Sequence, residues 1–531
     1  MIRGALAWLE DRTGIESAVK SFLYEDIPDS AGWHQVFGSV AIFAFLVQTV
    51  TGILLAFNYA PTPGEAYDSL RYIMTQVTAG TLLRGAHHWG ASLMIVVVVV
   101  HMIQALLWGA YRKPREVTWI AGVLLLLLTM AFGLSGYLLP WDNRAYWGTV
   151  VTTQIAALAP GAGPLLTRLL GSDGTSVGVL TFARFYSAHV LLLPPLTMLL
   201  IGLHVYLVRR HGVAPTPADE NKPKKRFYPE QVAKDAVAMF VWFAVLMGMA
   251  ALARVPLGHV ADPTDLSYVP RPEWYFLFLF QFLKWFEGPL EVVGAVILPT
   301  LAILGLILVP FIDRGRMKMV RHRTGAIGAV LFGLIFWGGL TARAVATTPE
   351  SREMDMSLVQ PWQEVPAQNL ASIGYFRKAQ CASCHTVGAV GAGPDLTAAR
   401  STKAADWIEG HIQSNPKAPG VLDEAEVQML ATFVAQRGDK AVDAWQNAPQ
   451  SAVDGALLYL ANQCGTCHKL NGVGDDIGPP LNGVGERRDR AWIEQHFADP
   501  PKLSPGSLMP AFTFSPGDLK LITDYITRIP K

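Results

Sequence analysis

The sequence predicts an all-α fold: a seven-span transmembrane helical bundle followed by two small α-helical domains. Three observations lead to this prediction. Seven apolar stretches are long enough to cross a bilayer. The C-terminal part is polar, and it contains all four cysteines in two copies of one pattern. The composition, 51% hydrophobic and 16% charged, is too apolar for an ordinary soluble enzyme and too polar for a chain lying entirely within a membrane.

The first residues, 1–22, have no typical cleavable apolar region and no small-residue cleavage site. This segment is predicted to form an amphipathic surface helix ahead of the first span. The seven spans are expected near residues 35–57, 88–109, 117–139, 186–208, 235–254, 291–312 and 325–345.

Lysine and arginine gather in three loops, 110–118, 209–234 and 313–324, whereas the alternate loops are much less basic. The positive-inside rule places these three loops on the cytoplasmic side of the membrane. We expect a multi-pass protein of a bacterial inner membrane. The N-terminus is then cytoplasmic, and everything beyond residue 346 lies on the outer, periplasmic face. The net charge of +1 gives no indication of nucleic-acid binding.

Four histidines lie in the second and fourth spans as two pairs, His87 with His101 and His189 with His204. Spacings of fourteen and fifteen residues are about four helical turns, or roughly 21 to 23 Å. A lone histidine in an apolar helix is usually hydrogen-bonded inside a bundle. Four in matched pairs at membrane depth indicate function, because ionisable groups there are costly. We therefore expect two non-covalent haems b, an outer one between His87 and His189 and an inner one between His101 and His204, bound by neutral imidazoles.

Two glycines in the first span, Gly38 and Gly52, are also fourteen residues apart, as are Gly122 and Gly136 in the third span. Glycine allows a helix backbone to approach a bulky neighbour closely. This spacing suggests helices that lean on the faces or edges of both haems. Ordinary glycine-mediated helix packing is the alternative.

The pattern Cys-x-x-Cys-His, which attaches a c-type haem, occurs twice in the tail. A redox or zinc motif is disfavoured because both copies carry the histidine. The surroundings repeat as well, since 393–396 resembles 478–481 and 407–417 resembles 492–502. We therefore expect two covalent haems c in tandem helical modules, with attachment at Cys381, Cys384, Cys464 and Cys467 and axial ligation by His385 and His468.

The two modules differ at the second axial position. The second module supplies Met509 on a loop before its last helix. In the first module that loop is shortened after Lys417, and Met429 is expected to pack inside the last helix. The first haem c is therefore predicted to lack ordinary His/Met ligation. Its alternatives are His411, another side chain or an open position, although His411 has a counterpart in His496.

The loop after the fifth span contains Glu273 within the segment Pro272-Glu273-Trp274-Tyr275, followed by several phenylalanines. An apolar pocket suits a quinol, and a carboxylate there can accept a proton as electrons leave. An interfacial aromatic belt is the alternative, which the histidine geometry disfavours.

Residues from about 20 to 345 resemble cytochrome b of the cytochrome bc complexes, and most of all the b6f form. The resemblance is carried by the four histidines, the fifteen-residue spacing, segment 136–147 and segment 272–275. The remainder resembles a dihaem class I cytochrome c. This resemblance implies four domains: 1–215 with four spans and both haems b, 216–346 with three spans, and cytochrome c domains at 365–440 and 450–531.

The resemblance implies a quinol:cytochrome c oxidoreductase that runs a proton-motive Q cycle. It implies a quinol-oxidising site with Glu273, Tyr275 and Tyr137. The other assignments that it implies are an inner quinone-reducing site with Arg209, Lys234 and Asp235, and haem-propionate partners Arg84 and Arg184.

The resemblance implies a Rieske iron–sulphur protein as the high-potential electron acceptor. Every cysteine of this chain is committed to haem c, so we expect the Rieske protein to be a separate subunit. A soluble cytochrome c or a terminal oxidase is expected as electron acceptor, and the resemblance implies a homodimeric complex. Two departures stand out: no cysteine precedes Cys381 to attach the extra b6f haem, and Asn143 stands where glutamine is common. The alternatives are a haem anchor for a partner dehydrogenase and a non-catalytic electron relay or assembly scaffold.

Overall fold

A computed structural model covers the chain, and the structure describes residues 2–173, 176–219, 222–265, 268–315, 319–348, 353–386, 392–393, 395–396, 403–415, 420–436 and 439–531. The chain divides into two compact units, Met1–Ser351 and Arg352–Lys531, and each is taken by itself.

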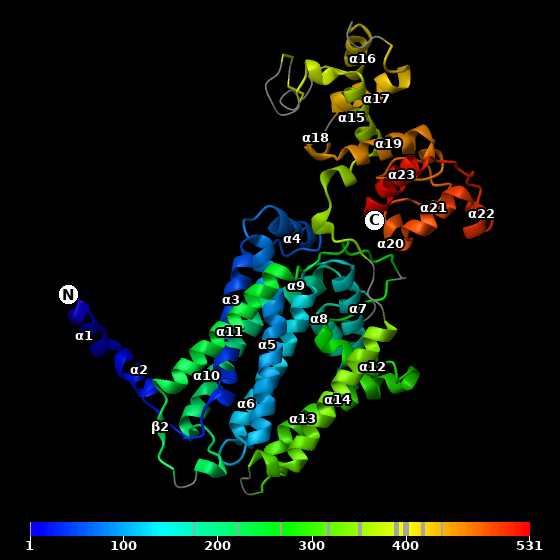
Figure 1. Ribbon diagram of the computed structural model, residues 1–531. Coiled ribbons are helices and arrows are strands. Elements are labelled where there is room, and N and C mark those ends of the chain that lie inside the picture. Colours follow the sequence, from blue (N-terminus) through cyan, green and yellow to red (C-terminus); the bar gives the residue numbers. More distant parts are fainter. Residues whose placement is uncertain are drawn as a thin grey trace. The chain divides into compact units, whose positions relative to one another are not determined.

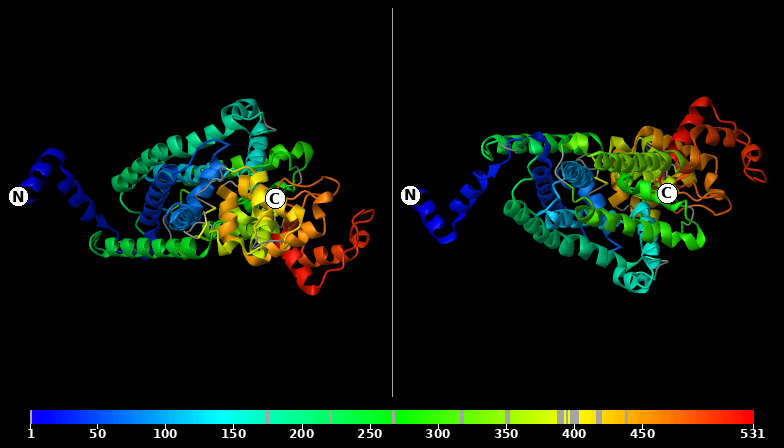
Figure 2. Two further views of the ribbon diagram at one scale, coloured as in Figure 1. Left: turned by 90° about the horizontal axis from the view of Figure 1, so that it is seen from above. Right: turned by 90° about the horizontal axis from the view of Figure 1, so that it is seen from below.

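Among the described residues of the first unit, seven helical segments are long and apolar enough to cross a membrane, as predicted. They run along a common direction in Figure 1, and Figure 2 views them from both ends. Their bounds are α3 (Phe37–Ala56), α5 (Gly80–Trp108), α6 (Glu116–Tyr137), α9–η2–α10 (Val179–His211), α11 (Glu230–Leu252), η5–η6–α13 (Gly288–Ile312) and α14 (Thr324–Thr347).

The second and fourth spans begin seven or eight residues earlier than predicted, at Gly80 and Val179. Their first turns carry polar residues such as Arg84 and Arg184, which hide the helix in a hydropathy profile. The extension is important because it places His87 and His189 within continuous helical spans rather than near the start of each span.

The fourth span contains a single π turn, η2 (Ala188–Leu192), which includes His189. Pro194 and Pro195 follow at the start of α10 (Leu193–His211) and have no N–H for the preceding turn's carbonyls. A π turn holds one more residue than an α turn. This extra residue accounts for the fifteen-residue spacing of His189 and His204, against fourteen in α5.

Short helices lie between the spans: α4 (Ala66–Thr75), α7 (Asn143–Ala157), α8 (Gly163–Leu170) and α12 (Leu277–Leu283). The helix α7 begins at a strong N-cap, where the Asp142 carboxylate accepts a hydrogen bond from the Ala145 backbone at 2.9 Å. The segment 1–22 forms α1 (Ile2–Thr13) and α2 (Ile15–Leu23), which extend away from the bundle in both figures. The strands β1 (Asp26–Ile27) and β2 (Lys225–Arg226) pair antiparallel.

The three basic loops meet at one end of the bundle. Arg112 Nη2 lies 2.8 Å from Asp313 Oδ1, and Arg323 Nη2 lies 2.7 Å from Asp313 Oδ2. Arg115 donates to the backbone oxygens of His211 and Gly212 at 2.9 and 3.2 Å. The loops therefore share a side, as predicted; residues 316–318 of the third loop lie outside the described residues.

The second unit packs around one continuous apolar core that extends through both predicted modules. The leading helix of the first module, α15 (Ala367–Lys378), packs on that of the second, α19 (Gln450–Ala461). The first module also contains α16 (Ala405–Gln413) and α17 (Glu424–Gln436), α18 (Asp439–Asn447) connects the two, and the second continues with α20 (Val484–Arg487), α21 (Arg490–Ala498), α22 (Pro500–Leu503) and α23 (Pro516–Arg528).

Short 3₁₀ turns complete the description: η1 (Trp33–Gln35), η3 (Pro217–Asp219), η4 (Trp274–Phe276), η5 (Gly288–Leu290), η7 (Val320–His322), η8 (Met356–Leu358), η9 (Pro361–Gln363), η10 (Cys381–Ser383) and η11 (Cys464–Thr466), with a second π turn at η6 (Val293–Ile297).

Candidate functional site

The four membrane histidines face one another in the pairs predicted from topology. The ring centroids of His87 and His189 are 6.4 Å apart, and those of His101 and His204 are 6.5 Å apart. The planes of the two rings are inclined by 74° and 77°. Each pair joins α5 to the fourth span.

These distances between ring centroids match those expected for two imidazoles that bind one metal ion. Two imidazoles on one iron need ring centroids about 6 Å apart, since a metal–nitrogen bond is about 2 Å and a ring centroid lies about 1 Å beyond its nitrogen. Histidines in direct hydrogen-bonded contact would lie closer. Both pairs therefore fit axial ligation of a haem iron.

The four glycines lie directly against the four histidine rings. A Cβ atom on Gly52 would lie 3.1 Å from His87 Cε1, and one on Gly136 would lie 2.7 Å from His189 Cε1. At the inner pair, Cβ atoms on Gly38 and Gly122 would each lie 3.3 Å from the nearest imidazole carbon, in His101 and His204 respectively. The glycines thus make room for the imidazoles, a closer role than the predicted contact with haem faces or edges.

Glu273 forms an ion pair that the sequence did not predict. Its Oε1 lies 2.5 Å from Arg144 Nη2, and the Glu273 side chain is only 14% exposed. Arg144 Nε donates to the Tyr137 hydroxyl at 3.3 Å, and Tyr137 donates to the Arg271 backbone oxygen at 3.2 Å. Glu273 and Tyr137, two of the predicted quinol-site residues, are therefore joined through Arg144.

Burial alone would lower the pKa of the Arg144 guanidinium, but Glu273 and Tyr137 raise it above its usual range. Arg144 is thus a permanent cation beside Glu273. Its signal in the sequence is a single basic residue inside the apolar, aromatic segment 136–147.

Tyr275 packs on α6 near the outer histidine pair. A Cβ atom on Gly133 would lie 3.0 Å from the Tyr275 hydroxyl, and Gly133 is three residues before Gly136, which touches His189. Burial raises the pKa of Tyr275, so its hydroxyl stays protonated. The third predicted quinol-site residue therefore lies one helical turn from the outer pair.

Asn143 joins the start of α7 to the backbone of residues 259–262. Its side-chain oxygen accepts a hydrogen bond from the Asp262 backbone at 2.7 Å, and its own N–H donates to the His259 backbone at 3.0 Å. These bonds fix the start of α7, and hence Arg144, to the segment that leads into Glu273.

The predicted inner quinone-site residues have three separate sets of contacts. Asp235 is buried and accepts hydrogen bonds from Ser39 Oγ and Gln231 Nε2, both at 2.9 Å. Lys234 pairs with Glu230 at 2.5 Å, and Arg209 Nε lies 3.6 Å from Glu25 Oε2. Of the three, Asp235 lies nearest to a histidine pair, because Ser39 adjoins Gly38, which contacts His101.

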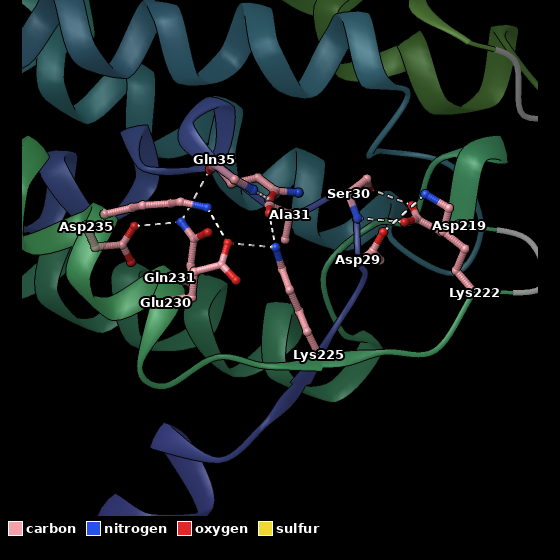
Figure 3. Close-up of polar contacts among 12 residues, drawn as sticks. Asp29, Ser30, Ala31, Gln35, Asp219, Lys222, Lys225, Glu230, Gln231 and Asp235 are labelled. Carbon is pink, nitrogen blue, oxygen red and sulfur yellow. Dashed lines mark hydrogen bonds and ion pairs between the residues drawn. The ribbon is translucent and has the colours of Figure 1, made fainter.

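Asp235 lies in a wider region of polar contacts near the start of α11. Figure 3 shows this region, which includes Gln231, Glu230 and Lys225. Lys225 Nζ donates to the Ala31 backbone oxygen at 2.7 Å and lies 3.2 Å from Glu230 Oε1. The carboxylate of Asp219 accepts hydrogen bonds from the Ser30 backbone and hydroxyl at 2.8 and 2.6 Å. Burial alone would raise the pKa of Asp219. The hydrogen bonds from Ser30 and Thr216 outweigh this effect and lower the pKa to about 2.

The two arginines expected to bind haem propionates contact backbone oxygens. Arg84 is buried and donates to Val255 and Pro256 at 2.7 and 3.0 Å. Arg184 donates to the Arg168 backbone oxygen. Their propionate role remains a prediction.

In the tail, the cysteine motifs form matching turns, η10 (Cys381–Ser383) and η11 (Cys464–Thr466). The N–H groups of His385 and His468 donate to the oxygens of the first cysteines, Cys381 and Cys464, at 2.9 and 3.0 Å. The second cysteines, Cys384 and Cys467, close these turns.

His468 is oriented by a hydrogen bond from Nδ1 to the Pro479 backbone oxygen at 2.7 Å. That bond leaves Nε2 free, as an iron ligand requires. The corresponding residue of the first module, Pro394, lies outside the described residues.

The candidates for the second axial ligand also differ between the modules. Met509 lies partly buried against the tail's core, and so does Met429 in α17. The ring centroid of His411 lies 6.2 Å from that of His385, inclined by 79°. This geometry resembles the two membrane pairs, so the structure keeps His411 among the alternatives. Lys417, where the loop is shortened, lies outside the described residues.

Comparison with known proteins supplies the family. A family model described as "Cytochrome b/b6/petB" matches residues 26–212, and one described as "Cytochrome b(C-terminal)/b6/petD" matches 260–356. The cytochrome b subunit of a cytochrome bc complex from Chlorobaculum thiosulfatiphilum is 38% identical over 322 residues, which cover 59% of this chain and 74% of that protein. The chain belongs to the cytochrome b family of the cytochrome bc complexes.

Two further comparisons agree with this membership. Cytochrome b6 from Synechococcus sp. (strain JA-3-3Ab) is 39% identical over 207 residues, 39% of this chain and 96% of that protein. A solved structure titled "Hyperthermophilic respiratory Complex III" is similar with a TM-score of 0.59 and 28% identity, covering 64% of this chain and 91% of that one.

The tail of this cytochrome b consists of cytochrome c domains. A family model described as "Cytochrome c" matches residues 452–529, and one described as "Cytochrome C oxidase, cbb3-type, subunit III" matches 368–434. The chain is therefore a membrane-spanning electron-transfer protein in which haem b and haem c domains are fused.

Proposed function

We propose that this cytochrome b is the catalytic subunit of a bacterial quinol:cytochrome c oxidoreductase that operates a Q cycle. The proposal is supported above all by one arrangement, in which one predicted residue of each quinone site, Tyr275 or Asp235, lies near a histidine pair. Tyr275 contacts α6 one turn from the glycine that touches His189, and Asp235 contacts the residue beside the glycine that touches His101.

In this proposal, His87 with His189 and His101 with His204 hold two haems b, and each of the two tail domains binds one haem c by its cysteine motif. Each haem, when bound, can accept and release one electron at its iron. Arg84 and Arg184 would face propionates.

At the outer site, quinol loses two electrons and two protons to become quinone. A separate Rieske subunit would accept one electron at its iron–sulphur cluster, and the haems b held by the two histidine pairs would accept the other. Glu273 accepts a proton, while Arg144 pairs with its carboxylate and Tyr137 and Tyr275 shape the pocket. Two such turnovers supply two electrons to quinone at the inner site, where Asp235 and Lys234 would pass two protons from the cytoplasm to the quinone and the Arg209 cation would help to hold it.

The tail, on the periplasmic side, would receive electrons from the Rieske protein and pass them to a soluble cytochrome c or a terminal oxidase. The three basic loops at one end of the bundle support this orientation. A homodimeric complex is proposed from the family alone.

The test is inhibitor-sensitive quinol:cytochrome c activity of the purified complex, with Glu273→Gln as the variant. Glu287→Gln, an exposed residue fourteen positions later in the sequence, is the control. We expect at least a tenfold slower turnover in the first, with the haem spectra unchanged, and normal turnover in the second. Full turnover of Glu273→Gln, or purification without a Rieske subunit, would favour the haem-anchor and relay alternatives.

A further inference from the structure

The rings of the outer histidine pair have a hydroxyl at their second nitrogen. Thr51 Oγ1 lies 3.0 Å from His87 Nδ1, and Ser135 Oγ lies 2.9 Å from His189 Nδ1. Both hydroxyls come from neighbouring spans, α3 and α6.

The inner pair lacks such a partner. Among the described residues, His101 Nδ1 and His204 Nδ1 are buried without a hydrogen bond. The backbone of Thr118 lies near His204 but does not meet the geometry of a hydrogen bond.

The direction of the outer hydrogen bonds follows from the protons available. The Thr51 hydroxyl donates its one proton to the Val47 backbone oxygen at 2.8 Å, and the Ser135 hydroxyl donates to Ala131 at 2.7 Å. An imidazole that binds iron through Nε2 carries its proton on Nδ1. Each outer Nδ1–H therefore donates to a hydroxyl oxygen whose own proton is already in use.

The residues that precede the repeated glycines in the sequence differ between the outer and inner levels. Thr51 directly precedes Gly52, and Ser135 directly precedes Gly136. Fourteen residues earlier, at the inner level, the corresponding positions are Phe37 and Ala121, which have no side-chain oxygen.

We infer that Thr51 and Ser135 are positioning residues that lower the reduction potential of the outer haem b below that of the inner one. An acceptor at Nδ1–H makes the imidazole a more basic ligand, which stabilises ferric over ferrous iron. Two such acceptors act at the outer level, and among the described residues none acts at the inner level. Electron transfer from the outer to the inner haem is thereby made favourable, in the inward direction that the proposed Q cycle needs. The inference rests on the proposed haem ligation.

The test is an equilibrium redox titration of the haem b absorbance in the purified full chain, with haem content and electron paramagnetic resonance spectra alongside. The double variant Thr51→Val with Ser135→Ala removes both acceptors. Thr49→Val and Thr129→Val are matched controls, because those hydroxyls donate to backbone oxygens in the same two helices without facing a histidine.

We expect the lower of the two midpoint potentials to rise in the double variant and both to stay in the controls. A tenfold change in the preference for ferric iron corresponds to about 59 mV. Ala121→Ser places a hydroxyl at the inner level and should lower the other midpoint instead.

Two outcomes separate the inference from the proposal beneath it. If both haems b remain and neither midpoint moves in the double variant, the tuning role is wrong although ligation stands. If His87→Ala retains both haems b with native spectra, the ligation itself is wrong.

Discussion

Arg144 and Glu273 form an ion pair across 129 residues of sequence, with the guanidinium nitrogen 2.5 Å from the carboxylate oxygen. The ion pair can therefore control the pH range in which the Glu273 carboxylate accepts a proton. In water such a pair has little effect, whereas here the carboxylate is largely buried, so the cation beside it has a strong influence.

Replacing Arg144 with glutamine should make the Glu273 carboxylate harder to ionise. A base must be ionised to accept a proton, so the acid limb of the pH–rate profile of quinol oxidation should move to higher pH. Arg144→Lys keeps the charge and should restore most of the wild-type profile. An unchanged acid limb in Arg144→Gln would show that the pair does not control this step.

Asp235→Asn should slow the reoxidation of the inner haem b by quinone, by roughly tenfold, because a buried proton acceptor is lost. Glu16→Gln, an exposed carboxylate of α2 that pairs with Lys20, is the control. Reoxidation after a quinol pulse measures this step separately from quinol oxidation. Equal rates in the two variants would remove Asp235 from the inner site.

Gly136→Ala should cause loss of the outer haem b, because the new Cβ would lie 2.7 Å from His189 Cε1. Overpacking of this kind costs about 1–3 kcal/mol and displaces the ring. Gly202→Ala, where nothing lies within 4 Å, should retain both haems. The count of haems b by difference spectroscopy decides between them.

Only one haem c should show methionine ligation in near-infrared magnetic circular dichroism of the full chain. Met509→Ala should abolish that signal, whereas Met429→Ala should leave it. His411→Ala should alter the spectrum of the other haem if His411 is its ligand. Two methionine-ligated haems in the wild type would refute the predicted difference between the modules.

Asp313 should stabilise the bundle in a pH-dependent manner. Burial would raise the pKa of this carboxyl, but hydrogen bonds from Tyr111, Arg112 and Arg323 lower it to about 2, from 3.8. Its contribution is therefore present above about pH 4 and is lost as the pH falls towards 2. Asp313→Asn should lower the melting temperature near pH 6, and the difference from the wild type should shrink through that window.

The seven spans, the tail and the histidine pairing were predictable because each depends on local periodicity and topology. The contact of Arg144 with Glu273 was not, since it joins distant loops and leaves no periodic trace. The π turn at His189 was visible only as one extra residue, whose cause lies in the two prolines after it. The role of Asn143 likewise depends on a backbone segment more than a hundred residues away.

The first four spans and the last three are held together by contacts that do not depend on chain continuity. Arg84 binds the backbone at Val255, Trp119 donates to Leu306, and Asp313 joins Arg112 to the later half. The bundle should therefore survive a cut between α10 and α11, and two co-expressed fragments should reassemble with both haems b. Fusion of the two halves in one chain therefore fixes their stoichiometry: every protomer contains one copy of each half and one tail.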